Sequence, residues 1–169
     1  MNARLQRSRS PMPFAPSRGE SGRDPARIGI VEDQPAVIAA LSSLLETEPG
    51  FAVCGHAGTV EGARELVDQH QPDVLLLDLG LGAESGFDLL SEWGASWEGA
   101  VLMVSVRSET SNAVPALRAG ASGYLMKADI AEYLIEAVHT ILRGGVYLSA
   151  AGKRLPGAAE MMAARSRWG

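Results

Sequence analysis

Three acidic residues, one serine and one lysine each follow a short apolar run of the chain. They are Glu32, Asp33, Asp78, Ser105 and Lys127. If the runs are parallel strands, their carboxyl ends meet at one edge of a sheet, which is where α/β proteins bind ligands. Three carboxylates at one edge repel one another, and a single ammonium group cannot neutralise them all. A divalent cation can, and Mg²⁺ accepts oxygen ligands while keeping some of its waters. The sequence therefore predicts a carboxylate-bound Mg²⁺ site.

The elements that must position these groups alternate along the chain. Short apolar runs predict five buried strands, at residues 28–31, 51–54, 74–77, 101–104 and 123–126. Between the runs, apolar residues recur at helical spacing, as in the stripe formed by Val37, Ile38, Leu41, Leu44 and Leu45. This alternation predicts an α/β fold with a single doubly wound, five-stranded parallel sheet and helices on both faces.

Local signals also bear on two helix boundaries. Asp129 followed by Glu132 has the spacing of a capping box, and Gly144 predicts the end of the same helix. Pro115 lies inside the helix expected before the fifth strand, where it removes a backbone hydrogen bond. We therefore expect that helix to be short or kinked.

The charge of the chain is unevenly distributed. Residues 28–149 hold five basic and seventeen acidic residues, a net charge of −12, whereas residues 1–27 carry +4 and residues 150–169 carry +3. This acidic middle argues against a nucleic-acid-binding surface, which needs clustered Lys and Arg. We expect a disordered basic leader over residues 1–26, a folded domain over residues 27–149, and a tail over residues 150–169 that can form a short helix and dock on a protein surface.

The compartment follows from what the chain contains. Its single cysteine, Cys54, cannot form an internal disulfide, which fits a reducing compartment. The N-terminal arginines are followed by prolines, and no apolar run approaches the roughly 18 residues needed to span a bilayer. We expect a cytoplasmic protein without a membrane partner.

The motifs around the polar residues resemble those of the response-regulator receiver domain of two-component systems. In chain order they read RIGIVEDQP, VLLLDLGLG, SGFDLL, VLMVSVRS and GASGYLMKAD. Their order and spacing match that family over about residues 26–149. The resemblance implies a flavodoxin-like sheet with strand order 2-1-3-4-5.

Carried over residue by residue, the resemblance assigns roles at the site. It implies that Asp78 is the phosphoryl acceptor, and that Asp33 and Asp78 coordinate Mg²⁺ through their carboxylates. Glu32 would bind the ion through a water, and Gly80 would supply its backbone carbonyl. Lys127 would pair with the acceptor carboxylate and later with a phosphate oxygen.

The resemblance also implies a switch and its partners. Ser105 would hydrogen-bond a phosphoryl oxygen, and Tyr124 would be an aromatic switch that turns inward when Ser105 moves. The phosphodonor would be a sensor histidine kinase or a phosphotransfer protein, and the signal would pass to a downstream protein or a homodimer. Such a domain catalyses its own phosphorylation and dephosphorylation but is not a conventional turnover enzyme.

Two departures from the family pattern lead to further expectations. Gly82 stands where the family usually has a proline, so the loop after Asp78 should be more flexible. The segment RGGVYLSAAG resembles the close of receivers that continue into a LuxR-type helix-turn-helix, but only twenty residues follow residue 149. We therefore expect no sequence-specific DNA binding by this chain. The alternative is a truncated or degenerate relative of a DNA-binding transcriptional regulator, acting as a phosphorylation-independent binding module.

Overall fold

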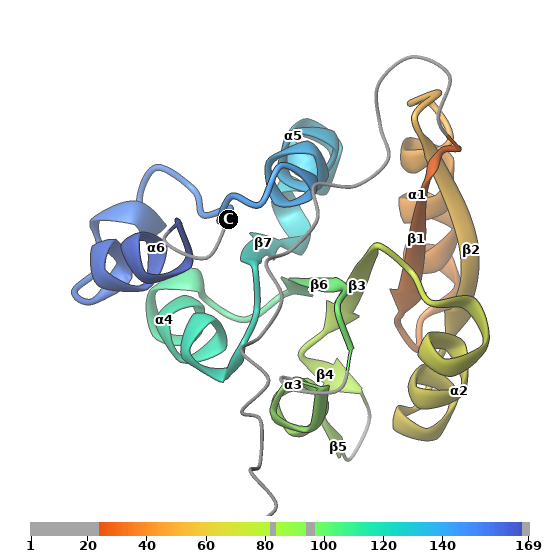
Figure 1. Cartoon of the computed structure of the whole chain (residues 1–169), viewed down its shortest axis with the longest axis horizontal. Coiled ribbons are helices and arrows are strands. Elements are labelled where there is room, and N and C mark those ends of the chain that lie inside the picture. Colours follow the sequence, from red (N-terminus) through yellow and green to blue (C-terminus); the bar gives the residue numbers. More distant parts are fainter. Residues whose placement is uncertain (1–23, 82–83, 94–96, 167–169) are drawn as a thin grey trace, which may run out of the picture.

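The computed structural model describes residues 24–81, 84–93 and 97–166 (Figure 1). Its main sheet has five strands in the order β2-β1-β3-β6-β7, and every neighbouring pair is parallel. The strands are β1 (Ala26–Val31), β2 (Phe51–Ala57), β3 (Val74–Asp78), β6 (Ala100–Ser105) and β7 (Gly123–Met126). Numbered among themselves these are strands 2-1-3-4-5, so the predicted sheet and its order are confirmed.

The central strands are apolar along their whole length because both faces of the sheet are covered. Alternate residues of β3 point to opposite sides: Leu75 and Leu77 join one apolar cluster, while Val74 and Leu76 join the other. All five residues of β3 are buried, including Asp78 at its end. The two clusters hold the sheet between two layers of helices.

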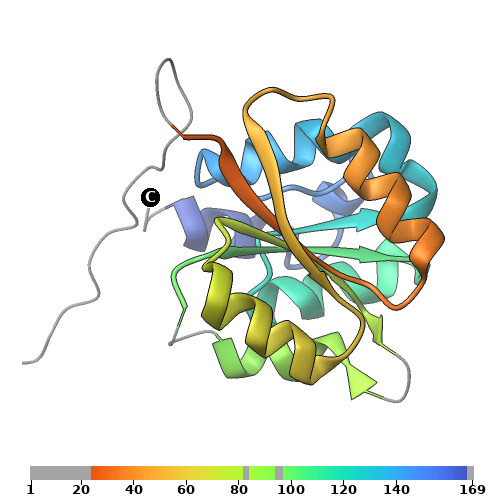
Figure 2. The ribbon, with the colours of Figure 1, turned by 90° about the vertical axis from the view of Figure 1, so that its right-hand side faces the viewer.

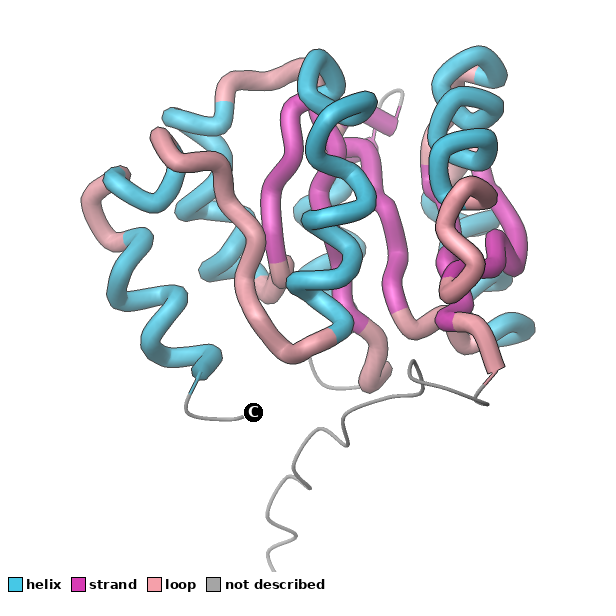
Figure 3. The backbone as a smooth tube through the Cα atoms, turned by 90° about the horizontal axis from the view of Figure 1, so that it is seen from above, coloured by secondary structure: helices cyan, strands magenta, loops and turns pink. Residues whose placement is uncertain are grey.

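The helices lie in the two layers that the doubly wound fold requires. Helices α1 (Pro35–Leu45) and α5 (Ile130–Leu142) cover one face, and α2 (Val60–His70), α3 (Gly86–Trp93) and α4 (Glu109–Ala119) cover the other (Figure 2). Seen from above, the strands lie between the helices (Figure 3). None of the helices in the described parts of the chain is long and apolar enough to cross a membrane.

The local helix signals have mixed outcomes. Gly144 follows the end of α5 with φ +79°, a left-handed conformation that favours glycine, as predicted. The predicted start of α5 is confirmed, since Asp129 is its N-cap residue, but the Asp129 side chain makes no capping bond and a 3₁₀ turn over Lys127–Asp129 leads into the helix. Helix α4 is not short, because it has eleven residues with Pro115 inside it, and the alternative of a kink stays a prediction. Pro115 and Ser111, four residues earlier, are exposed, so water can reach the carbonyl that Pro115 leaves without its usual donor.

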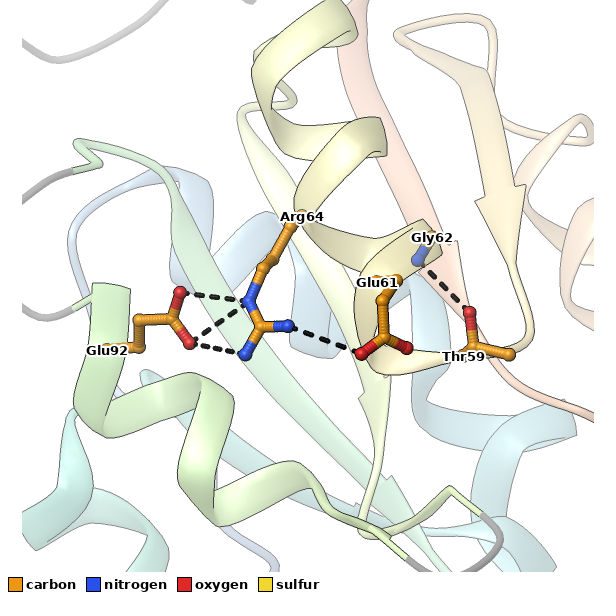
Figure 4. Close-up of polar contacts among 5 residues, drawn as sticks. All are labelled: Thr59, Glu61, Gly62, Arg64 and Glu92. Carbon is orange, nitrogen blue, oxygen red and sulfur yellow. Dashed lines mark hydrogen bonds and ion pairs between the residues drawn. The ribbon is translucent and has the colours of Figure 1, made fainter.

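An ion pair joins two helices of the same layer. Arg64 of α2 donates from Nε and Nη2 to the carboxylate of Glu92 on α3, at 2.8–3.1 Å, and lies 3.7 Å from Glu61 (Figure 4). At the start of α2, Thr59 caps the helix by accepting from the Gly62 amide at 3.1 Å. The hydrogen bond from Arg64 lowers the pKa of Glu92. These contacts join α2 to α3 at the surface, where ion pairs contribute little to stability.

The last described residues continue past α5 along the edge of the sheet and then over α4. Tyr147 is bridged in parallel to Gly123 of β7, with backbone hydrogen bonds of 3.0 and 3.1 Å on either side. A 3₁₀ turn over Gly152–Arg154 follows, and then α6 (Ala158–Ser166), which lies beside α4 (Figure 1). The edge strand β7 is therefore paired on both sides.

Candidate functional site

The polar residues singled out in the sequence lie at the carboxyl ends of the parallel strands. Asp78 and Ser105 are the last residues of β3 and β6, Glu32 and Asp33 directly follow β1, and Lys127 directly follows β7. In β1, β3, β6 and β7 a polar residue is the last of the strand or directly follows it. Because the strands are parallel, all of these groups lie along one edge of the sheet.

The three carboxylates lie close enough to share one cation. Glu32, Asp33 and Asp78 each offer an oxygen, and these oxygens all lie within 4.8 Å of one another. Glu32 and Asp78 are 2% and 6% exposed, whereas Asp33 is open to solvent. A set of carboxylate oxygens with one solvent-facing member suits a hard divalent cation that keeps part of its water shell. The residues present therefore fit Mg²⁺.

Lys127 is held between two of these carboxylates. Its Nζ lies 2.5 Å from Oε2 of Glu32 and 3.3 Å from Oδ2 of Asp78. Burial by itself would lower the pKa of Lys127, but the hydrogen bond to Glu32 and the charges of Asp78 and Glu32 outweigh it and raise the pKa. The ammonium group is thus charged at neutral pH and offsets part of the negative charge of the site.

The segment after Asp78 turns back on itself beside the carboxylate. The Gly80 amide donates to Oδ1 of Asp78 at 3.2 Å, a contact that sequence reasoning missed because it expected only the carbonyl of this residue to act. Two short strands, β4 (Gly80–Leu81) and β5 (Glu84–Ser85), pair antiparallel just after it. The flexibility expected at Gly82 falls on a residue outside the described part of the chain.

Ser105 and Tyr124 are connected through the backbone of one residue. The Ser105 hydroxyl accepts from the Arg107 amide at 3.0 Å, and the Tyr124 hydroxyl donates to the Arg107 carbonyl at 2.8 Å. Tyr124 is 1% exposed, so its ring lies inside the protein, and burial raises its pKa. No side-chain signal could have identified Arg107, because only its backbone takes part.

A model of the response regulator receiver domain matches residues 28–139, more than half of the chain. The chain is 33% identical over 132 residues to the nitrate/nitrite response regulator protein NarL of Escherichia coli (strain K12), covering 78% of this chain and 61% of that protein. It is 34% identical over 126 residues to the transcriptional regulatory protein DegU of Brevibacillus brevis, covering 72% of this chain and 52% of that protein. The chain thus spans between half and two thirds of the length of these curated relatives.

Solved structures give the same similarity. A two-component response regulator of the LuxR family from Aurantimonas sp. SI85-9A1 superposes with a TM-score of 0.68 at 30% identity, covering 85% of this chain and 99% of that one. The signal receiver domain of the putative response regulator NarL from Mycobacterium tuberculosis has a TM-score of 0.67 at 26% identity, covering 72% of this chain and 98% of that one.

Proposed function

This chain belongs to the response regulator receiver domain family, and from that premise we propose that it is a cytoplasmic phosphorylation switch whose acceptor is Asp78. The donor would be a histidine kinase or a phosphotransfer protein of a two-component system. The observation that carries the proposal is the arrangement at the sheet edge. A buried Asp78 carboxylate lies beside two further carboxylates and 3.3 Å from the Lys127 ammonium.

The groups present match the needs of transfer to a carboxylate. An oxygen of Asp78 attacks the phosphorus of the donor in line, the bond from phosphorus to the donor nitrogen or oxygen breaks, and the electron pair leaves with the donor. The Gly80 amide and Lys127 hold the acceptor carboxylate in place before transfer. Lys127 then neutralises charge on the transferred group, and the Ser105 hydroxyl can turn to donate to one of its oxygens.

The acid cluster would hold the metal in this proposal. Asp33 and Asp78 would bind Mg²⁺ directly, Glu32 would bind it through a water, and the Gly80 carbonyl would complete the protein ligands. When bound, the ion supplies charge neutralisation for the phosphoryl oxygens. Glu32 also accepts from the Gln34 amide at 3.0 Å, so its carboxylate is oriented by the chain itself.

Intact mass spectrometry after incubation with acetyl phosphate and Mg²⁺ tests the proposal. We expect one phosphoryl adduct on the wild-type chain and none on Asp78→Asn, because the amide is a poor nucleophile and a weaker metal ligand. Asp73→Asn is a matched control, since Asp73 precedes the same strand at its other end. An adduct of wild-type extent on Asp78→Asn would place the acceptor elsewhere, and no adduct on the wild type would favour the phosphorylation-independent binding module.

A further inference from the structure

The last described residues cover an apolar face of α4. Leu155, Met161 and Met162 pack against the cluster that contains Val114 and Leu117 of α4. Ala158, the first residue of α6, is completely buried. Figure 1 shows α6 beside α4 on the side away from the strands. Residues 149–166, which we call the strap, therefore occupy a face of α4 that would otherwise meet solvent.

One acidic side chain holds the beginning of the strap. Glu109, the first residue of α4, accepts from the Ser149 amide at 2.9 Å through Oε1 and from the Ser149 hydroxyl through Oε2. The Ser149 hydroxyl oxygen accepts in turn from the Gly152 amide at 3.0 Å. A Cβ at Gly152 would overlap Oε1 of Glu109, so the carboxylate would have to move to make room for it. We call these three residues the Glu109 latch.

Glu109 of the latch lies four residues along the chain after Ser105, which belongs to the candidate site. Ser105 ends β6 and accepts from the Arg107 amide, and Glu109 follows Arg107 by two residues. If the Ser105 hydroxyl turns toward a phosphoryl oxygen, the Arg107 amide loses its acceptor. The same segment is tied to Tyr124 through the Arg107 carbonyl, so a shift there reaches the first residue of α4.

We propose that the strap is a removable cover of α4, held by the Glu109 latch and released when Asp78 is phosphorylated. The release rests on the proposed function, whereas the docking of the strap through the latch does not. Hydrogen bonds to a charged carboxylate, such as those of Glu109, are stronger than neutral ones, and their loss should therefore open the strap. Because a peripheral segment can open locally, the sheet and the other helices should stay folded.

Hydrogen–deuterium exchange of the unmodified full chain tests the latch. We expect Glu109→Ala and Gly152→Ala each to speed exchange of the strap amides by about tenfold or more. In the Glu109→Ala background, Gly152→Ala should add little, because the carboxylate that its Cβ would overlap is gone. Glu61→Ala, which removes a carboxylate from the first turn of α2, is the matched control and should leave the strap unchanged. Wild-type exchange in the strap of both single variants would overturn the latch.

The release is tested on the wild-type chain with acetyl phosphate and Mg²⁺, reading the mass adduct and the exchange in the same sample. We expect the adduct to form and strap exchange to rise, with exchange in α2 unchanged. An adduct with unchanged strap exchange would overturn the release and leave the proposed function standing. No adduct would overturn the proposed function and the release together, and the Glu109 and Gly152 variants would still decide whether the latch holds the strap.

Discussion

At the scale of single residues, the site depends on one lysine that serves two carboxylates. Lys127 reaches Glu32 and Asp78 together, and its raised pKa shows that their charges outweigh the cost of burying it. A compact ammonium group fits between two carboxylates, whereas a planar guanidinium group would have to align with one of them. The shape of this cation therefore matters as much as its charge.

We expect Lys127→Arg to slow phosphorylation by about tenfold or more, because a misplaced cation no longer aligns with the transferred group. The rate is measured as growth of the phosphoryl adduct by intact mass. Thermal unfolding serves as the control that the fold is kept. Wild-type kinetics in this variant would mean that Lys127 does not act at the reacting carboxylate.

A second residue-scale prediction concerns the acid cluster. At a tenfold excess of Mg²⁺ over its Kd, binding to the native state adds about 1.4 kcal/mol, which raises the melting temperature by roughly 3–5 °C. We expect Asp33→Ala to lose this shift, because the substitution removes one of the two carboxylates proposed to bind Mg²⁺ directly. Calorimetry with and without Mg²⁺ measures it, and Asp68→Ala on the exposed side of α2 is the control. A full shift in Asp33→Ala would show that Asp33 is not a ligand.

At the scale of elements, the sheet continues beyond its fifth strand. The segment around Tyr147 hydrogen-bonds to the outer side of β7, and a Cβ at Gly123 would lie 2.8 Å from the Tyr147 carbonyl. Glycine at this position therefore allows the close approach. The pairing covers the sheet edge that α4 and α5 flank, and it leads the chain directly to the Glu109 latch.

Tyr147 makes this segment sensitive to alkaline pH. Burial, aided by the charge of Glu136, raises the pKa of Tyr147 from 10.0 to about 12. As the pH rises, the Tyr147 hydroxyl loses its proton in the unfolded chain before it does so in the folded protein. The free energy of unfolding is therefore unaffected by this group below pH 10 and falls by roughly 2 kcal/mol as the pH rises toward 12. We expect Tyr147→Phe to lose less unfolding free energy over that range. Urea unfolding at several pH values measures it, and parallel curves for the two proteins would contradict the assignment.

At the scale of the whole molecule, the negative charge is concentrated in the folded middle of the chain. Residues 28–149, which form the sheet and its five helices, carry a net charge of −12. Such a surface repels the phosphates of a duplex. The curated relatives are longer than the part that this chain matches, so any DNA recognition by those proteins need not involve the region shared here.

We expect this chain, phosphorylated or not, to bind DNA without sequence preference. A mobility-shift titration at physiological salt, with specific and scrambled competitors, measures the preference. Residual binding should weaken steeply with added salt, because the basic residues at the two ends of the chain can contact phosphates only non-specifically. A preference of about tenfold, equivalent to 1.4 kcal/mol, would show that the chain reads bases.

The sequence by itself determined the alternation of strands and helices and the positions of the polar groups. Both are local features of the sequence. A run of apolar residues predicts a buried strand, and Asp78, Ser105 and Lys127 each follow such a run directly. The match of five motifs to one family then supplied the strand order, which periodicity cannot give. The spacing of Asp129 and Glu132 located the start of α5, but it does not reveal that a 3₁₀ turn precedes the helix or that Asp129 makes no side-chain capping bond.

Only the tertiary structure decided which groups meet. The contact of Lys127 with Glu32, the backbone link through Arg107 and the Glu109 latch all join residues that are far apart in the sequence; Glu109 and Ser149 are separated by 40 positions. Their pairing follows from how α4, β7 and the chain after α5 pack, and no local pattern encodes it. Side-chain partners across a fold are fixed by packing, whereas the elements themselves are fixed by the chain's own periodicity.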